Sequence, residues 1–255
     1  MTESMTWVVP CYNEGDRLDG DAFRSLVDGE SELSLLFVDD GSHDHTRGRL
    51  EELAQERNGR IRVLSLPINQ GKAEAVRTGL RAALGQGASL VGYLDADLAT
   101  PVAEARRLRR VLAERDVDVV LASRVALLGR TIERHALRHY SGRIFATLAS
   151  LALELPVYDT QCGAKLFRRT PALEAALGEP FLSRWAFDVE LIGRLLVGAA
   201  GVPGLDPSRI VEEPLFVWRD VPGSKLRLAH MLRAAADVGR IAWDLRARRR
   251  ARQVG

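Results

Sequence analysis

The chain has 255 residues, of which 46% are hydrophobic and 27% are charged, and its formal net charge at pH 7 is +2. This composition is ordinary for a soluble globular protein, and the nearly balanced charge favours no particular class of partner. Cys11 and Cys162 lie far apart and in no metal-ligand spacing, which argues against a disulfide framework and favours a reducing, cytoplasmic setting.

We expect neither a signal peptide nor a membrane-spanning helix. The first residues, MTESMTWVVP, contain no basic region followed by a long apolar region, which a signal peptide needs. The longest apolar stretch, residues 144–155, is shorter than the about 20 residues that cross a bilayer.

The first half of the chain alternates short apolar runs with segments of helical spacing. Strands are predicted at 6–10, 33–40, 61–66, 89–94 and 117–123. Helices are predicted at 44–56, 72–84 and 101–114. Strands that are apolar throughout and separated by helices indicate a parallel sheet covered on both faces, which is an α/β fold of the doubly wound type.

The second half of the chain changes character. The predicted elements are a long, basic, amphipathic helix at 134–155, a loop leading into a strand at 158–169, and a loop leading into a helix at 183–196. A strand at 210–217 then precedes WRDVPGSKLRL and a final helix. Because no internal repeat or linker interrupts the chain, we expect one domain at residues 1–225 and a basic amphipathic helix with a tail at 226–255.

Polar clusters follow three of the predicted strands, at residues 10–14, 39–42 and 95–97. Ligands of open α/β sheets bind beyond the carboxyl ends of the strands, so we expect these clusters to converge at one edge. Asp95 and Asp97 can present two carboxylates to one point, and Mg²⁺ usually takes one or two carboxylates together with substrate phosphates. The sequence therefore predicts a metal site that holds a diphosphate; a polar turn with capping aspartates is the alternative.

Two further loops offer groups for a nucleotide. Asp39 and Asp40 could accept hydrogen bonds from a nucleobase or from ribose hydroxyls, although this loop could equally cap the following helix. Lys72 brings a positive charge near a helix N-terminus, where anions are favoured. The chain has no Walker loop, and no GxGxxG follows the first strand, which argues against a nicotinamide enzyme.

The order of motifs along the chain resembles that of a known family. VVPCYNE, LLFVDDGSHDHT, NQGKAEAVRTGL and YLDADL together resemble the family 2 glycosyltransferases with the GT-A fold. DTQCGAKLF, RWAFDVEL and WRDVPGSKL are similar to the polyprenyl-phosphate hexosyltransferase branch, which includes dolichyl-phosphate glucosyltransferases and mannose synthases. The resemblance covers residues 6–228 and implies a Rossmann-like, mostly parallel sheet with helices on both faces and a C-terminal amphipathic helix.

The resemblance also implies roles for residues at matching positions. The nucleotide-sugar donor is expected to contact Pro10, Tyr12, Glu14, Asp39, Gln70, Lys72, Asp95 and Arg124. The metal ion, Mg²⁺ or Mn²⁺, is expected on Asp95 and Asp97. The acceptor is expected to contact Arg138, Ser141 and Gln161. The catalytic residues implied are Asp97, Asp188, Arg219 and Lys225. The chain departs from the family pattern at Ala164, where an aromatic residue is common.

The resemblance implies an inverting reaction, in which the acceptor displaces a nucleoside diphosphate at the anomeric carbon. The cation would stabilise most of the charge on the leaving group, with help from Arg219 and Lys225. A phosphate acceptor is already an anion and needs no base, so Asp188 would then only orient groups. A sugar hydroxyl needs a base, for which Asp188 is the candidate. Both roles stay open at the level of the sequence.

The function favoured by the sequence is transfer of a hexose from a nucleotide sugar to a polyprenyl phosphate. UDP-glucose is preferred over GDP-mannose as the donor, and a soluble or saccharide acceptor is the alternative. A sugar-nucleotide pyrophosphorylase would need a glycine-rich loop where PCYNE stands. A nucleic-acid partner is not expected, because only 6% of the residues are aromatic and the arginines cluster at one end.

The C-terminal segment carries apolar residues at helical spacing, among them Val238, Ile241 and Leu245, with arginines largely off that stripe. Such a helix either rests on anionic lipid or packs on the domain. Because a polyprenyl acceptor lies in lipid, the resemblance favours peripheral association with the cytoplasmic face of a membrane, with a separate membrane protein as a candidate partner.

Overall fold

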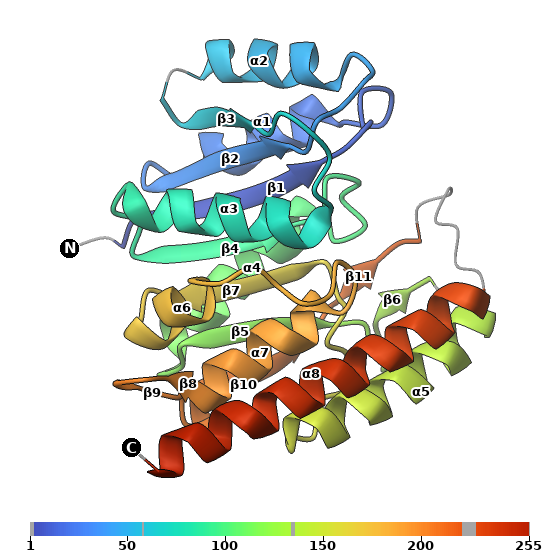
Figure 1. Cartoon of the computed structure of the whole chain (residues 1–255). Coiled ribbons are helices and arrows are strands. Elements are labelled where there is room, and N and C mark those ends of the chain that lie inside the picture. The colour runs from blue at the N-terminus through green and yellow to red at the C-terminus, as the bar shows by residue number, and fades with distance from the viewer. Residues whose placement is uncertain (1–2, 58, 134–135, 221–227, 255) are drawn as a thin grey trace.

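The core of the molecule is a sheet of seven strands. Figure 1 shows this sheet running through the molecule with helices packed against it. The computed structural model describes residues 3–57, 59–133, 136–220 and 228–254, and it describes their side chains except at 136–141, 228–234 and 253–254. The strands of the sheet are β1 (Met5–Cys11), β2 (Leu33–Asp39), β3 (Ile61–Ser65), β4 (Leu90–Leu94), β5 (Val119–Ser123), β7 (Ala164–Arg168) and β10 (Ile210–Pro214). Their order in space is β10-β5-β7-β4-β1-β2-β3.

β7 runs antiparallel to both of its neighbours, β4 and β5, whereas the other pairs in this sheet are parallel. Ala164 pairs with Leu94, the last residue of β4, so β7 begins at the edge where β4 ends. α5 (Ala136–Leu153) and the loop after it return the chain to this edge. The predicted α/β fold with a mostly parallel sheet is confirmed, and its one antiparallel strand brings residues 158–163 to the carboxyl ends of the other strands.

Helices cover both faces of the sheet. One face is covered by α1 (Gly20–Asp28), α2 (Thr46–Glu56) and α4 (Val102–Glu114). The other face is covered by α3 (Lys72–Gly85), α6 (Pro171–Ala176) and α7 (Phe187–Val197). Each layer buries its own apolar cluster, one around the edge-to-face rings of Phe23 and Phe37, the other around Tyr93 and Phe187. Burial of these clusters is the main force that holds the layers together.

α8 (Leu228–Val254) packs along α5 and α7 (Figure 1). Val238, Ile241 and Leu245 are buried in the cluster to which α7 also contributes. Gly193 on α7 allows this close approach, because a Cβ at that position would lie 2.3 Å from Leu245 Cδ1. Over these residues, the apolar stripe that could have rested on lipid is therefore part of the protein core.

Part of the basic tail is also engaged within the protein. Arg248 bonds Glu179 at 2.6 Å and Asp244 at 2.7 Å, and Arg249 bonds Glu154. Within the described ranges, no helix combines the length and the apolar character needed to cross a membrane.

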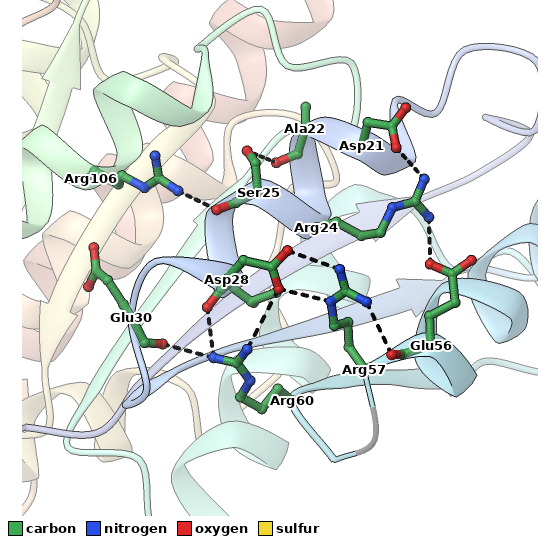
Figure 2. A network of polar contacts seen from close by, with 11 residues as sticks. Asp21, Ala22, Arg24, Ser25, Asp28, Glu30, Glu56, Arg57, Arg60 and Arg106 are labelled. Carbon is green, nitrogen blue, oxygen red and sulfur yellow. Dashed lines mark hydrogen bonds and ion pairs between the residues drawn. The ribbon is translucent and has the colours of Figure 1, made fainter.

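A surface network of ion pairs ties α1 to α2 and to the segment before β3 (Figure 2). Arg57 donates two hydrogen bonds to the carboxylate of Asp28, at 2.8 and 2.9 Å, and Arg60 Nη2 lies 3.7 Å from the same carboxylate. Arg24 pairs with Glu56 at 2.8 Å. Most of these residues precede β2 or β3, so the network fastens the outer helices at the amino ends of the strands, opposite the predicted site.

The elements that the sequence did not predict are short. They are α1 and α6, the two-residue strands β6 (Thr131–Ile132), β8 (Gly198–Ala199), β9 (Val202–Pro203) and β11 (Val217–Trp218), and the 3-10 helix η1 (Pro207–Arg209). The strand predicted at 210–217 ends at Pro214, and Val217–Trp218 pairs with β6 instead. α1 does carry a sequence signal, because Asp19 caps it by accepting a hydrogen bond from Ala22 N at 3.0 Å.

Candidate functional site

The loops that follow β1, β2 and β3 are joined to one another at the carboxyl edge of the sheet. Asp40 N donates to the carbonyl of Cys11 at 2.8 Å, and Leu66 N donates to that of Asp39 at 2.8 Å. These loops carry most of the residues predicted to contact a nucleotide, so the structure brings those residues to one edge, as expected.

The loop after β1 is clamped to the loop after β2. Asn13 N donates to Ser42 Oγ at 3.0 Å, and His43 N donates to Asn13 Oδ1 at 3.0 Å. Asn13 has a φ of 53°, a left-handed conformation that asparagine tolerates better than most residues. Tyr12 remains 42% exposed, with its ring edge-to-face against His43, and Pro10 is half-buried. The clamp thus fixes the backbone that presents the Tyr12 ring to solvent.

Asp39 and Asp40 are both buried but hold different partners. Asp40 accepts hydrogen bonds from Gln70 N at 2.7 Å and Gly71 N at 2.8 Å, one on each carboxylate oxygen. Asp39 Oδ1 accepts one from Ser42 N at 3.1 Å, within its own turn. Asp40 therefore fastens the loop that leads into α3, and Gln70 is positioned through its backbone.

Lys72 and Asp95 meet across the site. Lys72 is the first residue of α3, and its Nζ lies 2.5 Å from Asp95 Oδ1, just after the end of β4. Burial lowers the pKa of Lys72, but the carboxylates of Asp95, Asp188 and Asp97 outweigh it and raise that pKa above its ordinary value. The Lys72 ammonium group therefore stays charged among these carboxylates.

Asp95 and Asp97 form the acidic turn, residues 95–97, which follows β4. Asp97 Oδ1 accepts a hydrogen bond from Ala99 N at 3.0 Å. Burial, followed by the charge of Asp95, raises the pKa of Asp97. Burial also raises the pKa of Glu14, an effect that Arg17 opposes and that Asp97 and Asp95 increase. A carboxyl group whose pKa is raised by neighbouring carboxylates favours a nearby positive charge.

Gly163 packs against Asp95, and it was not among the site residues predicted from the sequence. Asp95 N donates to the carbonyl of Gly163 at 3.0 Å. A Cβ at Gly163 would lie 2.1 Å from Asp95 Oδ2, so only glycine leaves room for this carboxylate. A glycine in a polar loop immediately before an apolar strand is the signal that could have revealed it.

The residues of this turn fit a divalent cation that shares its coordination with a diphosphate. Asp95 and Asp97 supply carboxylate oxygens, the donors that Mg²⁺ and Mn²⁺ prefer. Within the part of the chain that the structure describes, no group of three or more His, Cys, Asp and Glu side chains is arranged to hold a metal ion. Mg²⁺ in proteins usually takes only one or two carboxylates, which is the number that this turn offers.

Asp188 lies in a buried cluster beneath the acidic turn. Its Oδ1 accepts hydrogen bonds from Lys165 Nζ at 2.7 Å and from the Tyr93 hydroxyl. Burial, followed by the charge of Asp188, raises the pKa of Tyr93 well above its ordinary value, so this phenol keeps its proton. The sequence indicated Asp188 but neither Lys165 nor Tyr93; a lysine inside the apolar run AKLF was the available signal.

Arg124 and Gln161 lie on the β5 side of the site. Arg124 forms a bidentate ion pair with Asp159, at 2.7 and 2.8 Å, and its guanidinium carbon lies 5.2 Å from the Trp218 ring centroid. Gln161 N donates to Asp159 Oδ1 at 3.2 Å, and Gln161 Nε2 donates to the carbonyl of Trp185 at 3.3 Å. Arg124, which was predicted to contact the donor, thus holds Asp159, and Asp159 in turn holds the backbone of Gln161.

The structure describes the remaining predicted residues to different extents. Arg219 is exposed, and its backbone N donates to the carbonyl of Ala99 at 3.1 Å, which brings it beside the acidic turn. Arg138 and Ser141 belong to α5, but their side chains lie outside the described residues. Lys225 lies outside the described ranges altogether.

Comparison of the sequence with known families and curated proteins gives a consistent result. The family model "Glycosyl transferase family 2" matches residues 6–174. Dolichyl-phosphate beta-glucosyltransferase ALG5C of Trichomonas vaginalis is 31% identical, over 95% of this chain and 72% of that protein. Dolichyl-phosphate beta-glucosyltransferase of Homo sapiens is 30% identical, over 88% of this chain and 70% of that protein.

Solved structures with a similar backbone include glucosyl-3-phosphoglycerate synthase from Mycobacterium tuberculosis. Its complex with UDP aligns with a TM-score of 0.67 at 20% identity, over 95% of this chain and 80% of that one. A complex of the same synthase with Mn²⁺, UDP and glucosyl-3-phosphoglycerate aligns with a TM-score of 0.65 at 18% identity. At such identities the likeness is one of fold.

Proposed function

Because the chain belongs to glycosyl transferase family 2 and has the GT-A fold, we propose that it transfers a glucosyl group from UDP-glucose to a polyprenyl phosphate. Membership of the family makes the chain a glycosyltransferase. The choice of donor and acceptor is supported by one observation above all, the similarity to dolichyl-phosphate β-glucosyltransferases along nearly the whole chain.

We propose that the donor diphosphate lies on the acidic turn after β4, with Asp95 and Asp97 holding Mg²⁺ or Mn²⁺. When bound, such a cation neutralises the charge that develops on a departing diphosphate. On the protein side, Tyr12, Glu14 and Asp39 are proposed to contact the nucleoside. Gln70 lies in the loop that Asp40 fastens.

In the proposed reaction an acceptor oxygen attacks the anomeric carbon from the face opposite the nucleotide. The bond from that carbon to the donor phosphate oxygen breaks, its electron pair leaves with UDP, and the configuration inverts. Lys72, whose ammonium group already lies among carboxylates at this edge, and the exposed Arg219 are proposed to stabilise the phosphate charges. Arg124 and Lys225 are proposed to assist.

The environment of Asp188 favours a phosphate as the acceptor. One of its oxygens already accepts two hydrogen bonds, one of them from the buried Lys165 ammonium group. A carboxylate held in this way is poorly suited to take a proton from a sugar hydroxyl. A phosphate oxygen is ionised before it attacks and needs no such base, so Asp188 is proposed to orient groups. Arg138, Ser141 and Gln161 are proposed to contact this acceptor.

A lipid acceptor would bring the protein to a membrane surface. Leu127 is 48% exposed and Leu128 is fully exposed, both in the loop that leaves the carboxyl end of β5. Apolar side chains in such a place suit contact with lipid beside the site. We propose peripheral association through this loop, on the cytoplasmic face, and a membrane protein partner stays a candidate.

A donor-by-acceptor screen tests the proposed function. Radiolabelled UDP-glucose and GDP-mannose are each incubated with a short-chain polyprenyl phosphate, the matching polyprenol and 3-phosphoglycerate, with MnCl₂ or with EDTA. We expect lipid-soluble label only with UDP-glucose, polyprenyl phosphate and MnCl₂. Transfer to 3-phosphoglycerate would instead support the soluble-acceptor alternative with Asp188 as base, and undiminished transfer in EDTA would contradict the metal site.

A further inference from the structure

Lys165 has a buried charge that the proposed reaction does not use. It lies in β7, and its side chain is 0% exposed. Its Nζ donates hydrogen bonds to the carbonyl of Cys162 at 2.8 Å and to Asp188 Oδ1 at 2.7 Å. A buried ammonium group is costly unless it is paired and hydrogen-bonded, so these two contacts determine where its charge can lie.

The first contact leads directly to the acidic turn. The carbonyl of Cys162 precedes Gly163, and Gly163 accepts the hydrogen bond from Asp95 N and packs against the Asp95 carboxylate. Any shift of the 162–163 backbone would therefore also shift Asp95. Lys165 holds that backbone in place through its hydrogen bond to the Cys162 carbonyl.

The second contact reaches the same turn by another route. Asp188 Oδ1, which Lys165 holds, also accepts the hydrogen bond of the Tyr93 hydroxyl. Tyr93 lies in β4 and precedes Asp95 by two positions. Lys165 is thus connected both to the 162–163 backbone, against which Asp95 packs, and to the end of β4, which Asp95 follows.

We propose that Lys165 is a positioning residue for Asp95: its buried ammonium group fixes the 162–163 turn and the Asp188 side chain, and thereby sets the geometry in which Asp95 and Asp97 receive a divalent cation with a nucleoside diphosphate. The proposal rests on the proposed function only for the identity of these ligands. Residues that support a metal ligand from behind typically change metal affinity by about 10- to 100-fold when they are replaced.

Lys165→Met tests the proposal, because methionine fills a similar volume without charge or donor. Mn²⁺ affinity is measured from the electron paramagnetic resonance signal of free Mn²⁺, and UDP affinity by calorimetry in saturating MnCl₂. We expect both affinities to fall by about tenfold or more. Unchanged affinities would overturn the proposal.

Lys165→Met also leaves Asp188 as an uncompensated buried charge, which by itself lowers stability. The double variant Lys165→Met with Asp188→Leu removes both charges and is expected to recover part of the lost melting temperature, since the Tyr93 hydroxyl loses its acceptor. The Cys162 carbonyl stays unheld in this variant, so Mn²⁺ affinity should remain weak. Recovery of full Mn²⁺ affinity along with the melting temperature would also count against the proposal.

Glu190→Gln provides a matched control on α7. Glu190 is fully buried and pairs with Arg194 at 2.6 Å, only two positions from Asp188 in the chain. The other carboxylate oxygen of Glu190 accepts a hydrogen bond from Leu182 N, which is not part of the acidic turn. We expect a lower melting temperature with unchanged Mn²⁺ affinity, and an equal loss of affinity would show that Lys165 has no specific role.

The two proposals fail in different ways. Wild-type protein that binds Mn²⁺ but neither UDP nor GDP would contradict the proposed function. The Mn²⁺ measurements on Lys165→Met and Glu190→Gln would still decide the role of Lys165.

Discussion

At the scale of single residues, the two carboxylates of the VDDGS motif divide their work. Asp39 bonds within its own turn, whereas Asp40 reaches the backbone of Gln70 and Gly71. Both contacts of Asp40 are shorter than 3 Å and charge-assisted, and such bonds are stronger than neutral ones. Asp40 therefore fastens the two residues that precede α3 and Lys72.

We expect Asp40→Ala to lower the free energy of unfolding by about 1 to 3 kcal/mol, because the N–H groups of Gln70 and Gly71 lose their acceptor. Urea unfolding followed by circular dichroism measures the change. Asp40→Asn keeps one acceptor oxygen and should lose less, so an equal loss in both variants would contradict this assignment.

Gly163→Ala should reduce kcat/KM by about 100-fold, the effect of misplacing a reacting group by about 1 Å. The physical reason is the alanine Cβ, which would collide with Asp95 Oδ2. Steady-state kinetics on the purified variant gives the measurement. Gly48→Ala is the control, because an added Cβ there would meet no atom within 4 Å from outside its own stretch of helix; it should keep full activity and gain about 0.5 to 1 kcal/mol of stability as a helix residue.

The sequence indicated the acidic residues of the candidate site but not the groups that hold them. Asp95 and Asp97 follow an apolar strand, and strand ends are where ligands bind, so their position could be predicted. The partners of Asp188 could not, because Lys165 and Tyr93 reach it from distant positions only once β4 and β7 pair. Such contacts depend on the fold and have no local spacing.

At the scale of elements, α8 is held to the domain by apolar packing and by ion pairs. The sequence allowed a helix on lipid or a helix on the protein, since an amphipathic stripe fits either surface. Burial of Val238, Ile241 and Leu245 supports packing on the protein for the described part of the helix.

Leu245→Ala should therefore lower the free energy of unfolding by about 2 to 5 kcal/mol, the usual cost of emptying a buried leucine site. Trp243→Ala on the same helix, where the side chain is 77% exposed, should change it by less than about 0.5 kcal/mol. Thermal and urea unfolding without lipid give both values. Equal, small changes would mean that α8 is not docked.

The ion pair of Glu179 with Arg248 gives α8 a pH-dependent contact. The hydrogen bond from Arg248 lowers the pKa of Glu179 below its ordinary value of 4.5. Stability from a carboxylate with a lowered pKa is present above the unfolded value and is lost as the pH falls through the folded value.

Glu179→Gln should thus cost about 0.2 to 1 kcal/mol at pH 7, because the Glu179 side chain is 66% exposed, and nothing once the carboxylate is protonated in both states. Urea unfolding at pH 7 and at a pH low enough to protonate Glu179 in the folded state, in a double-mutant cycle with Arg248→Met, measures the coupling. A coupling that persists at low pH, or that is insensitive to 1 M salt, would refute the assignment.

Element positions were predictable because each central strand is apolar throughout, as expected for a strand covered on both faces. The direction of β7 was not, because it depends on the edge at which the chain re-enters the sheet and not on composition. The short strands β6 and β11 pair across a long separation in the chain, and two residues give too little pattern to identify.

At the scale of the whole molecule, the site draws on strand ends from both halves of the chain. Glu14 and Asp39 come from the first loops, whereas Gly163 and Arg219 come from the second half. A ligand that touches all of these loops binds only the folded chain, so it should stabilise the entire domain.

We expect UDP with MnCl₂ to raise the melting temperature, and by linkage the gain in stability reaches about 2.7 kcal/mol at 100 times Kd. EDTA should abolish the shift, because Asp95 and Asp97 would then repel the diphosphate. Asp97→Asn should also lose it. Differential scanning fluorimetry measures the effect, and a full shift in EDTA would refute the metal site.

The place of β7 has a consequence for how the protein is made. β4 and β5 follow one another in the chain, but β7 lies between them in the sheet. In a nascent polypeptide that has left the ribosome only as far as β5, the edges of β4 and β5 that will pair with β7 are therefore unpaired. Unpaired strand edges are prone to pair with other chains. Synthesis has to proceed through residue 168 before the gap between β4 and β5 closes.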